Sequence, residues 1–157
     1  ERIGVERVAI NLRDFPIPDA DGRTPAEQPV VAGGPDAYLT ELPARAIRDA
    51  WQGAGLPGEI SHTAGTYVCN QTMYEAAHRS RGTGRRTGFI HLPATPESAA
   101  ESARNAAATP AVPRTAPGEP ATPTVPLAEL VRAVRIAAEV CLTEPKAVAL
   151  APSGALD

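Results

Sequence analysis

The sequence predicts an α/β domain in which helices pack against a largely parallel β-sheet. Three observations lead to this class. Apolar residues near the start of the chain alternate with strand spacing, strand-like and helical segments then follow one another in turn, and a long amphipathic helical pattern comes near the end. The length of 157 residues corresponds to one ordinary domain.

The first element is a strand predicted over residues 5–12, VERVAINL. Val8, Ile10 and Leu12 are two positions apart, and residues with that period point to one face of a strand. Residues 13–36 contain prolines, glycines and aspartates at close intervals, which favour turns over regular structure. The sequence therefore predicts one N-terminal strand followed by a long loop.

A helix is predicted from Pro43. Proline suits the first turn of a helix, where its missing N–H leaves no hydrogen bond unmade. Ile47, Trp51 and Ala54 follow at helical spacing on one face. Gly55 then ends the pattern. The segment is therefore expected to be an amphipathic helix that buries this face.

Two further strands and a helix are predicted in the middle of the chain. Residues 58–62 indicate a short strand that runs into a turn of small residues. A helix is expected after Cys69 and Asn70, extending through His78. Residues 87–92 form an apolar run ended by a proline, which indicates a buried strand. The resulting order of strand, helix, strand, helix and strand is typical of α/β domains.

Composition divides the chain into four segments. Residues 1–97 carry the elements above and form the main part of the domain. Residues 98–125 are rich in alanine and proline with almost nothing to bury, so they are expected to be a flexible insertion. Residues 126–143 are predicted to be the C-terminal helix of the same domain, and residues 144–157 a disordered tail.

The C-terminal helix has an apolar face that is expected to pack on the sheet. Cys141 lies on this face and is interpreted as a small buried hydrophobic residue. The face comprises Leu127, Leu130, Val131, Val134, Ala138 and Cys141.

Composition also excludes several classes of protein. No apolar run approaches the ~20 residues that a bilayer-spanning helix needs, so no membrane association is expected. The two cysteines make neither a disulfide framework nor a zinc motif, and no metal site is expected. No signal segment is recognised, which favours a cytoplasmic location. The net charge of −3 argues against a nucleic-acid partner.

The candidate chemistry centres on Cys69, which is expected at the start of a helix. Unpaired N–H groups and the helix dipole favour negative charge there, and a thiolate is a nucleophile. His91 lies near the end of a later strand, where its imidazole could take the thiol proton, and Glu6 could orient the imidazole. On spacing alone an alternative stays open, with a buried structural cysteine, a core histidine and a solvated Glu6–Arg7 pair.

Other polar residues are interpreted as structural or exposed. His62 and His78 have no ligand partners at metal spacing. Asn70 begins a glycosylation sequon, which is irrelevant without secretion. A basic loop is interpreted as solvated, because no aromatic residue is interleaved for stacking on nucleic acid. Its arginines are Arg79, Arg81, Arg85 and Arg86.

Five stretches of the chain occur in an order and spacing that resemble one family. They are VERVAIN (5–11), IPDADG (17–22), GGPDAYLTELPARAI (33–47), ISHTAGTYVCN (60–70) and GFIHLP (88–93). The family is pyroglutamyl-peptidase I, the pyrrolidone-carboxylate cysteine peptidases, and AGTYVCN and FIHLP are highly specific strings for it. The resemblance covers the chain almost continuously to around residue 97 and returns in the last helix.

The resemblance implies a triad of Cys69, His91 and Glu6 on a three-layer α/β/α fold with a mixed sheet, without metal or organic cofactor. The family members are omega-peptidases that remove N-terminal pyroglutamyl residues from peptides through a thioester intermediate. The resemblance also places Tyr67 and Val68, just before the nucleophile, in the wall of the lactam pocket. The family tends to form homotetramers, so a homo-oligomer is expected.

Three departures from the family pattern define an alternative. The family has a strand and a glycine- and phenylalanine-bearing loop before the position of residue 1, so the first strands are expected to be missing. Pro16 and Ala20 stand where the family often has arginine and asparagine, and proline cannot donate a hydrogen bond to an oxyanion. Residues 98–125 are an insertion. The alternative is a catalytically inactive homologue that binds a partner or self-associates.

Overall fold

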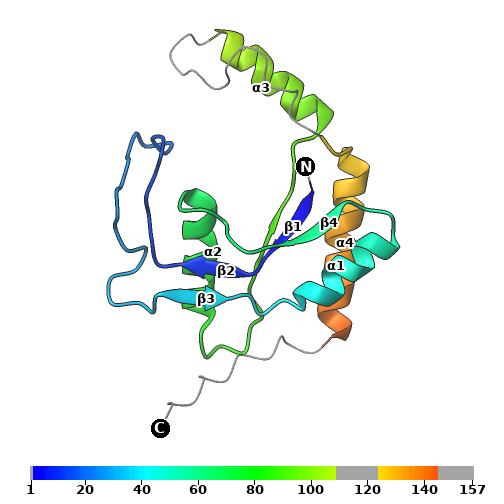
Figure 1. Cartoon of the computed structure of the whole chain (residues 1–157), viewed down its shortest axis with the longest axis horizontal. Coiled ribbons are helices and arrows are strands. Elements are labelled where there is room, and N and C mark those ends of the chain that lie inside the picture. Colours follow the sequence, from blue (N-terminus) through cyan, green and yellow to red (C-terminus); the bar gives the residue numbers. More distant parts are fainter. Residues whose placement is uncertain (1, 109–123, 145–157) are drawn as a thin grey trace.

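The computed structural model describes residues 2–108 and 124–144 (Figure 1). Strands alternate with helices through the middle of this region, and its main sheet is mixed, which confirms the predicted α/β class. The elements are β1 (Ile3–Glu6), β2 (Val8–Ile10), β3 (Ala37–Leu39), α1 (Ala44–Gly53), β4 (Gly58–Ser61), α2 (Val68–Ser80), β5 (Phe89–His91), α3 (Pro96–Ala108) and α4 (Leu127–Thr143).

The central sheet has three strands in the order β4–β1–β5. β1 runs parallel to β4, with Val5 opposite Ile60, and antiparallel to β5, with Gly4 opposite His91. All four residues of β1 are buried. The middle strand of the sheet is therefore covered on both faces, with Ile3 and Val5 on one and Gly4 and Glu6 on the other.

Residues 5–12 do not form the single strand that their alternation predicts. β1 ends at Glu6, and β2 pairs with β3 in a separate two-stranded sheet. Arg7 lies between the two strands: its N–H donates to the carbonyl of Ser61, and its carbonyl accepts from the N–H of Thr40. The chain therefore changes hydrogen-bonding partners at Arg7, and the prediction of one strand is wrong.

The buried face of β2 also differs from the predicted one. Ala9 is fully buried and packs with Met73 and Tyr74 of α2, whereas Val8 and Ile10 are half-buried. α2 lies against this side of the β2–β3 pair. The small side chain of Ala9 leaves room for the larger side chains of the helix.

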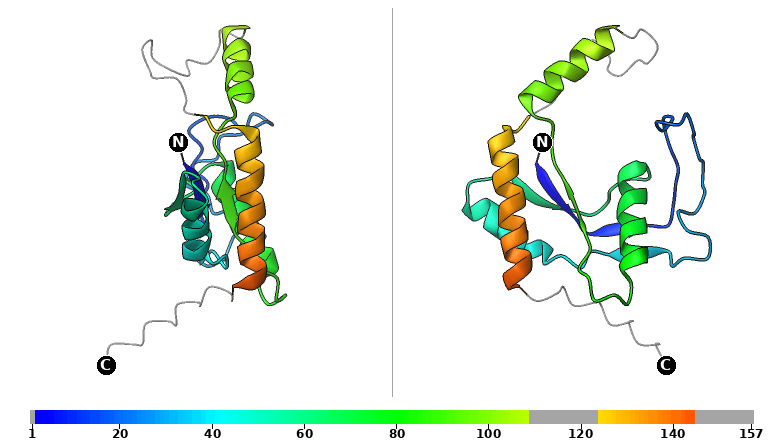
Figure 2. Two further views of the ribbon diagram at one scale, coloured as in Figure 1. Left: turned by 90° about the vertical axis from the view of Figure 1, so that its right-hand side faces the viewer. Right: turned by 180° about the vertical axis from the view of Figure 1, so that it is seen from behind.

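Helices α1 and α4 pack together over one face of the central sheet (Figure 2). Their buried side chains form one hydrophobic cluster with Ile3 and Val5 of β1. Trp51 of α1 is fully buried, and its indole N–H donates to the carbonyl of Ala133 in α4 at 2.9 Å. A Cβ on Gly58 would lie 2.7 Å from the Cβ of Trp51, so glycine allows α1 to approach β4 this closely.

α4 docks through a different face from the predicted one. Leu130, Ala133 and Ala137 are buried in the core, whereas Val131 and Val134 are 52% and 45% exposed. The helix carries two adjacent apolar stripes. The stripe with the alanines lies against α1, because small side chains let the backbone of α4 reach the indole hydrogen bond. The predicted packing of Val131 and Val134 on the sheet is therefore wrong.

The segment of residues 98–125 differs in its described part from the flexible insertion expected. Its start lies in α3, where alanine favours a helix. The hydroxyls of Thr95 and Ser98 each accept the backbone N–H of the other residue, at 3.1 and 2.9 Å, which caps the first turn. Val125 is 5% exposed and belongs to the core. Residues 109–123 and most of the predicted tail lie outside the described residues.

Candidate functional site

Glu6 and His91, the last residues of the neighbouring strands β1 and β5, contact each other directly. The Oε1 atom of Glu6 lies 2.5 Å from Nδ1 of His91. The side chain of Glu6 is 2% exposed and that of His91 is 39% exposed, so the ring reaches from a buried carboxylate to the surface. With Nδ1–H donating to the carboxylate, Nε2 is left as the acceptor of the ring. This histidine is therefore oriented to take a proton at its exposed edge.

The Glu6–His91 pair lies on the sheet face opposite α1 and α4. Ile3 and Val5 point into the α1–α4 core, so the alternate residues of β1 point the other way. Gly4 faces His91 across the sheet, and a Cβ there would lie 3.9 Å from both Oε1 of Glu6 and Cβ of His91. The ring of Phe89 packs edge-on against that of His91 with centroids 5.0 Å apart. The carboxylate of Glu6 and the ring of Phe89 therefore both hold the imidazole of His91 in its orientation.

Cys69 is the second residue of α2. The helix begins at Val68, one residue before the predicted nucleophile, after Tyr67 in an extended conformation. No side chain caps this end of the helix, so the first N–H groups of α2 are available to negative charge. The thiol is half-buried and in no disulfide. The position combines access to solvent with a helix terminus that favours an anion.

Asn70 positions the start of α2 and was not singled out for this role by the sequence. It is 1% exposed, its Oδ1 accepts the N–H of Ile10, and its Nδ2 donates to the carbonyls of Ile10 and Leu12, all at 2.9 Å. The amide therefore continues the hydrogen bonding of β2 and fixes the residue next to Cys69. The sequence, in which Asn70 only begins a glycosylation sequon, could not predict these hydrogen bonds, because only the fold brings β2 beside α2.

The loop after β2 packs against the residues that precede Cys69. The ring of Tyr67 lies edge-on to Phe15 with centroids 4.7 Å apart, and its hydroxyl donates to the carbonyl of Pro18 at 2.9 Å. Val68, the other residue predicted in the substrate pocket, is 39% exposed. The Tyr67 hydroxyl is thus engaged within the chain, whereas the Val68 side chain reaches solvent beside the thiol.

The structure joins two of the three predicted catalytic residues by contact, Glu6 and His91. Within residues 2–108 and 124–144, no hydrogen bond links Cys69 to either of them. Glu6 and Ser61 end the parallel strands β1 and β4 side by side, and the chain runs from Ser61 into the loop that leads to Cys69. A thiol and a carboxylate-oriented imidazole on adjoining elements are the groups that nucleophilic catalysis needs.

The arginines of the predicted basic loop mostly contact the protein itself. Arg79 pairs with Glu75 at 3.0 Å, and Arg81 lies over the ring of Tyr38 at 5.9 Å from its centroid. Arg86 donates to two carbonyls at the end of α4. These contacts hold the guanidinium groups of Arg79, Arg81 and Arg86 against the chain itself.

Two classes of feature are absent from the part of the chain that the structure describes. No three His, Cys, Asp or Glu side chains come together there as metal ligands would. No described helix is both long and apolar enough to cross a bilayer.

The thiol of Cys141 is expected to react more slowly with iodoacetamide in the folded chain than in the chain unfolded in urea. Burial raises the pKa of Cys141, and the nearby Arg86 guanidinium offsets this only in part. A raised pKa leaves less thiolate at each pH below it, and thiolate is the reactive form. Mass-spectrometric mapping across neutral to alkaline pH measures the rates. Equal rates in folded and unfolded chains at neutral pH would contradict the expectation.

Sequence comparison relates the whole described region to one family. The pyroglutamyl peptidase family model matches residues 1–144. A pyrrolidone-carboxylate peptidase of Aliivibrio fischeri is 46% identical over 99 residues, and one of Chromobacterium violaceum is 53% identical over 97 residues. These alignments cover 63% and 62% of this chain, and 47% and 45% of the relatives. The chain thus spans about half the length of these relatives.

The fold is similar to that of solved pyrrolidone carboxyl peptidases. The crystal structure of the protein from the hyperthermophile Pyrococcus furiosus matches with a TM-score of 0.76 and 32% identity, covering 90% of this chain and 63% of that one. The crystal structure of Pf-PCP(1-204)-C matches with a TM-score of 0.78 and 34% identity, covering 91% of this chain and 62% of that one. Both similarities extend over the α/β core.

Proposed function

The chain belongs to the pyroglutamyl peptidase family, and from this membership we propose that it is a cysteine peptidase that removes N-terminal pyroglutamyl residues from peptides. The observation that carries the proposal is the hydrogen bond from His91 to the buried carboxylate of Glu6, on elements adjoining that of Cys69. This pair supplies an oriented base, and the start of α2 supplies a nucleophile.

In the proposed reaction, Sγ of Cys69 attacks the carbonyl carbon of the pyroglutamyl residue. Nε2 of His91 takes the thiol proton, and the carboxylate of Glu6 stabilises the imidazolium through Nδ1–H. His91 then returns the proton to the leaving amine, the C–N bond breaks, and a thioester remains. Water that His91 deprotonates cleaves the thioester and releases pyroglutamate. We propose no metal or organic cofactor for these steps.

The substrate is distinguished by its lactam ring, which carries no free ammonium group. Recognition therefore depends on an apolar surface and on hydrogen bonds to the lactam C=O and N–H rather than on an ion pair. We assign part of this surface to Val68, which is exposed beside Cys69, and to Tyr67. The contact of Tyr67 with Phe15 supports this assignment, because it gives the wall a fixed aromatic backing.

Hydrolysis of a pyroglutamyl amide that releases a chromogenic amine tests the proposal. We expect steady release from this compound and none from the matching prolyl amide, in which CH₂ replaces the lactam carbonyl and the ring nitrogen is a protonated amine. Absence of release by a chain that melts cooperatively would reject the peptidase proposal. That result would favour the inactive homologue that the departures at Pro16 and Ala20 suggest.

The variant Glu6→Gln is expected to lower kcat/KM by about 10²- to 10⁴-fold. Glutamine keeps the shape of the side chain but cannot stabilise the imidazolium, and its NH₂ group can select the wrong tautomer of His91. Kinetics on the pyroglutamyl amide measure the loss, and the melting temperature reports folding. Glu129→Gln, at an exposed position of α4, is the matched control. A kcat/KM within about twofold of the unmodified chain would contradict the assigned role.

We also propose that the chain forms homo-oligomers through the exposed apolar stripe of α4. The stripe recurs along one side of the helix, and exposed apolar patches of this kind mark protein–protein contact sites. Its members and their exposed fractions are Leu127 (63%), Val131 (52%), Val134 (45%) and Leu142 (87%).

The variant Val131→Glu is expected to shift the chain to monomers, because the stripe would bury an unpaired carboxylate. Sedimentation velocity measures the shift. Ala128→Glu, on the same helix beside the stripe, is expected to leave the assembly intact. Sedimentation of the unmodified chain as a monomer would contradict the assembly itself.

A further inference from the structure

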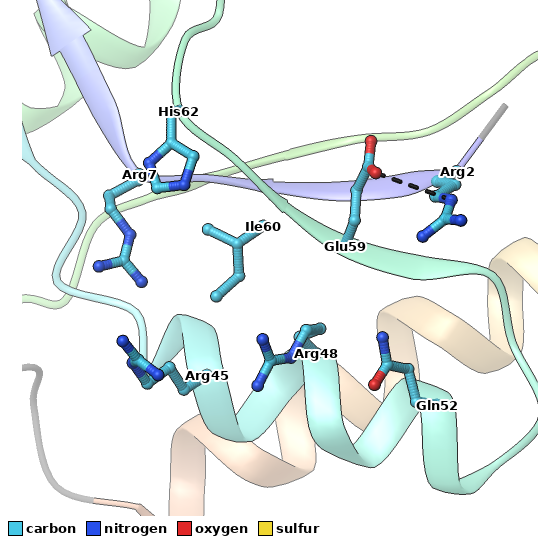
Figure 3. Close-up of a pocket in the computed structure, with 8 residues that line it drawn as sticks. All are labelled: Arg2, Arg7, Arg45, Arg48, Gln52, Glu59, Ile60 and His62. Carbon is cyan, nitrogen blue, oxygen red and sulfur yellow. Dashed lines mark ion pairs between the residues drawn. The ribbon is translucent and has the colours of Figure 1, made fainter.

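A pocket of ≈ 370 Å³ lies between α1 and the β4 edge of the central sheet (Figure 3). This volume falls within the range of about 300–1,000 Å³ that small-molecule sites occupy. The lining is strongly basic, and no Trp, Tyr or Phe contributes to it. Its arginines are Arg2, Arg7, Arg45 and Arg48.

Acidic side chains neutralise only part of this charge. Glu59 is the one carboxylate in the lining, and it lies 3.8 Å from the guanidinium of Arg2. Arg48 pairs with its neighbour Asp49 at 2.6 Å. Two of the four guanidinium groups therefore have acidic partners.

Arg7 and Arg45 are the two guanidinium groups of the lining that form no ion pair with the residues described. Figure 3 shows both reaching into the same space, Arg7 from the end of β1 and Arg45 from the first turn of α1. Nε of Arg7 is shielded from solvent and has no hydrogen-bond partner within the described ranges. Two neighbouring positive charges repel each other, and a buried N–H group without a partner costs free energy. An anion bound between the two guanidinium groups would reduce the repulsion and accept the missing hydrogen bond.

The start of α1 adds to the positive potential of the pocket. Its first turn has no acidic residue and no side-chain cap, and a helix N-terminus carries a partial positive charge. His62, which follows β4, adds a polar ring to the lining, whereas the amide of Gln52 donates to the carbonyl of Gly58 at 3.2 Å. The groups that face the space are thus mostly hydrogen-bond donors.

The pocket is separate from the Glu6–His91 pair. Ile60, which lines the pocket, is opposite Val5 and packs against the α1–α4 core. Glu6 is opposite Ser61, and adjacent positions of a strand point to opposite faces. The part of the pocket that Ile60 and the helix α1 line therefore lies on the sheet face opposite the catalytic pair.

We propose that this pocket binds the phosphoryl group of a small phosphorylated molecule between Arg7 and Arg45. Guanidinium groups donate in planar forks that match phosphate oxygens. Here the forks come from different elements and different directions, which suits a tetrahedral oxyanion better than a planar carboxylate. Because no Trp, Tyr or Phe lines the pocket for stacking, we expect recognition of charge rather than of a nucleobase.

Calorimetric titration of the full chain with inorganic diphosphate tests the proposal directly and requires no peptidase activity. We expect saturable binding at one site, weakened by added salt, and a rise in melting temperature beyond that given by sodium chloride at equal ionic strength. Citrate, a carboxylate anion of comparable charge, is expected to bind at least about tenfold more weakly. An equal rise in melting temperature with chloride and with diphosphate would contradict the existence of the site. An equal affinity for citrate and diphosphate would contradict the assignment of a phosphoryl group as the ligand.

Arginine variants locate the binding within the molecule. Arg45→Gln, at an exposed helix position, and Arg7→Gln are each expected to weaken diphosphate binding about tenfold or more. Arg135→Gln, on the exposed side of α4 away from the pocket, is expected to bind as the unmodified chain does. Circular dichroism verifies folding of each variant. Undiminished binding by a folded Arg45→Gln variant would overturn the proposal.

Discussion

Replacement of Cys69 by alanine is expected to abolish release of amine from a pyroglutamyl amide, with kcat/KM falling by about 10⁴-fold or more. Alanine has no nucleophile, so the thioester cannot form and His91 has no thiol to deprotonate. Folding is expected to be unaffected, because Cys69 is half-buried at a helix start and forms no disulfide. Stopped assays at high enzyme concentration set the detection limit, and thermal melting reports stability.

Cys141→Ala is the matched control for this experiment, since it removes the other thiol of the chain. Cys141 is also half-buried, but it lies on α4, packed against the core cluster. We expect its variant to retain kcat/KM within about twofold. Retained turnover in Cys69→Ala, or its loss in Cys141→Ala with folding intact, would reject the assignment of the nucleophile.

Replacement of Trp51 by alanine is expected to lower the free energy of unfolding by about 3–5 kcal/mol. The indole is fully buried at the junction of α1, α4 and β4, and its N–H donates to the carbonyl of Ala133. Gly58 beneath it leaves no side chain that could fill the cavity. A loss of this size is a large fraction of the roughly 5–15 kcal/mol typical of folded domains. Equilibrium unfolding in urea measures it.

The variant Trp51→Phe separates the two contributions of this residue. Phenylalanine keeps much of the ring but leaves the carbonyl of Ala133 without its donor, so we expect a loss of about 1–3 kcal/mol. A loss below about 1 kcal/mol in Trp51→Ala would show that the cluster does not depend on the indole. A loss in Trp51→Phe equal to that in Trp51→Ala would assign the whole effect to the hydrogen bond.

The sequence predicted the residues of the candidate site but could not predict their geometry. The strings around Cys69 and His91 are specific, and they pointed to Glu6 as the third group. The contact between Glu6 and His91 depends on β5 lying antiparallel to β1, a pairing between segments about 85 residues apart. The role of Asn70 depends in the same way on the position of β2.

The basic pocket carried no sequence signal. Arg7 and Arg45 are separated by a long loop and share no motif, and only the packing of α1 on β4 brings them to one space. The arginines that did stand out in the sequence, between residues 79 and 86, mostly contact the chain itself.

The sequence by itself predicted several of the elements, because helix and strand periods are local properties of the chain, but it predicted neither β3 nor α3. The helix after Pro43 ends at Gly53, two residues before the predicted Gly55. The strands predicted over residues 58–62 and 87–92 lie within those ranges. The predicted roles of Cys69 and His91 also came from short local strings. Each of these conclusions depends on neighbours within a few positions.

Only the tertiary structure decided which surfaces are buried and which backbone groups pair. α4 has two apolar stripes that are equivalent by periodicity, and the indole of Trp51 selects the one that contains Ala133. Residues 5–12 have one continuous alternation, and the chain still changes sheets at Arg7 because Ser61 and Thr40 supply its hydrogen bonds on opposite sides. A local pattern defines a face, but the partner that covers it comes from distant parts of the chain.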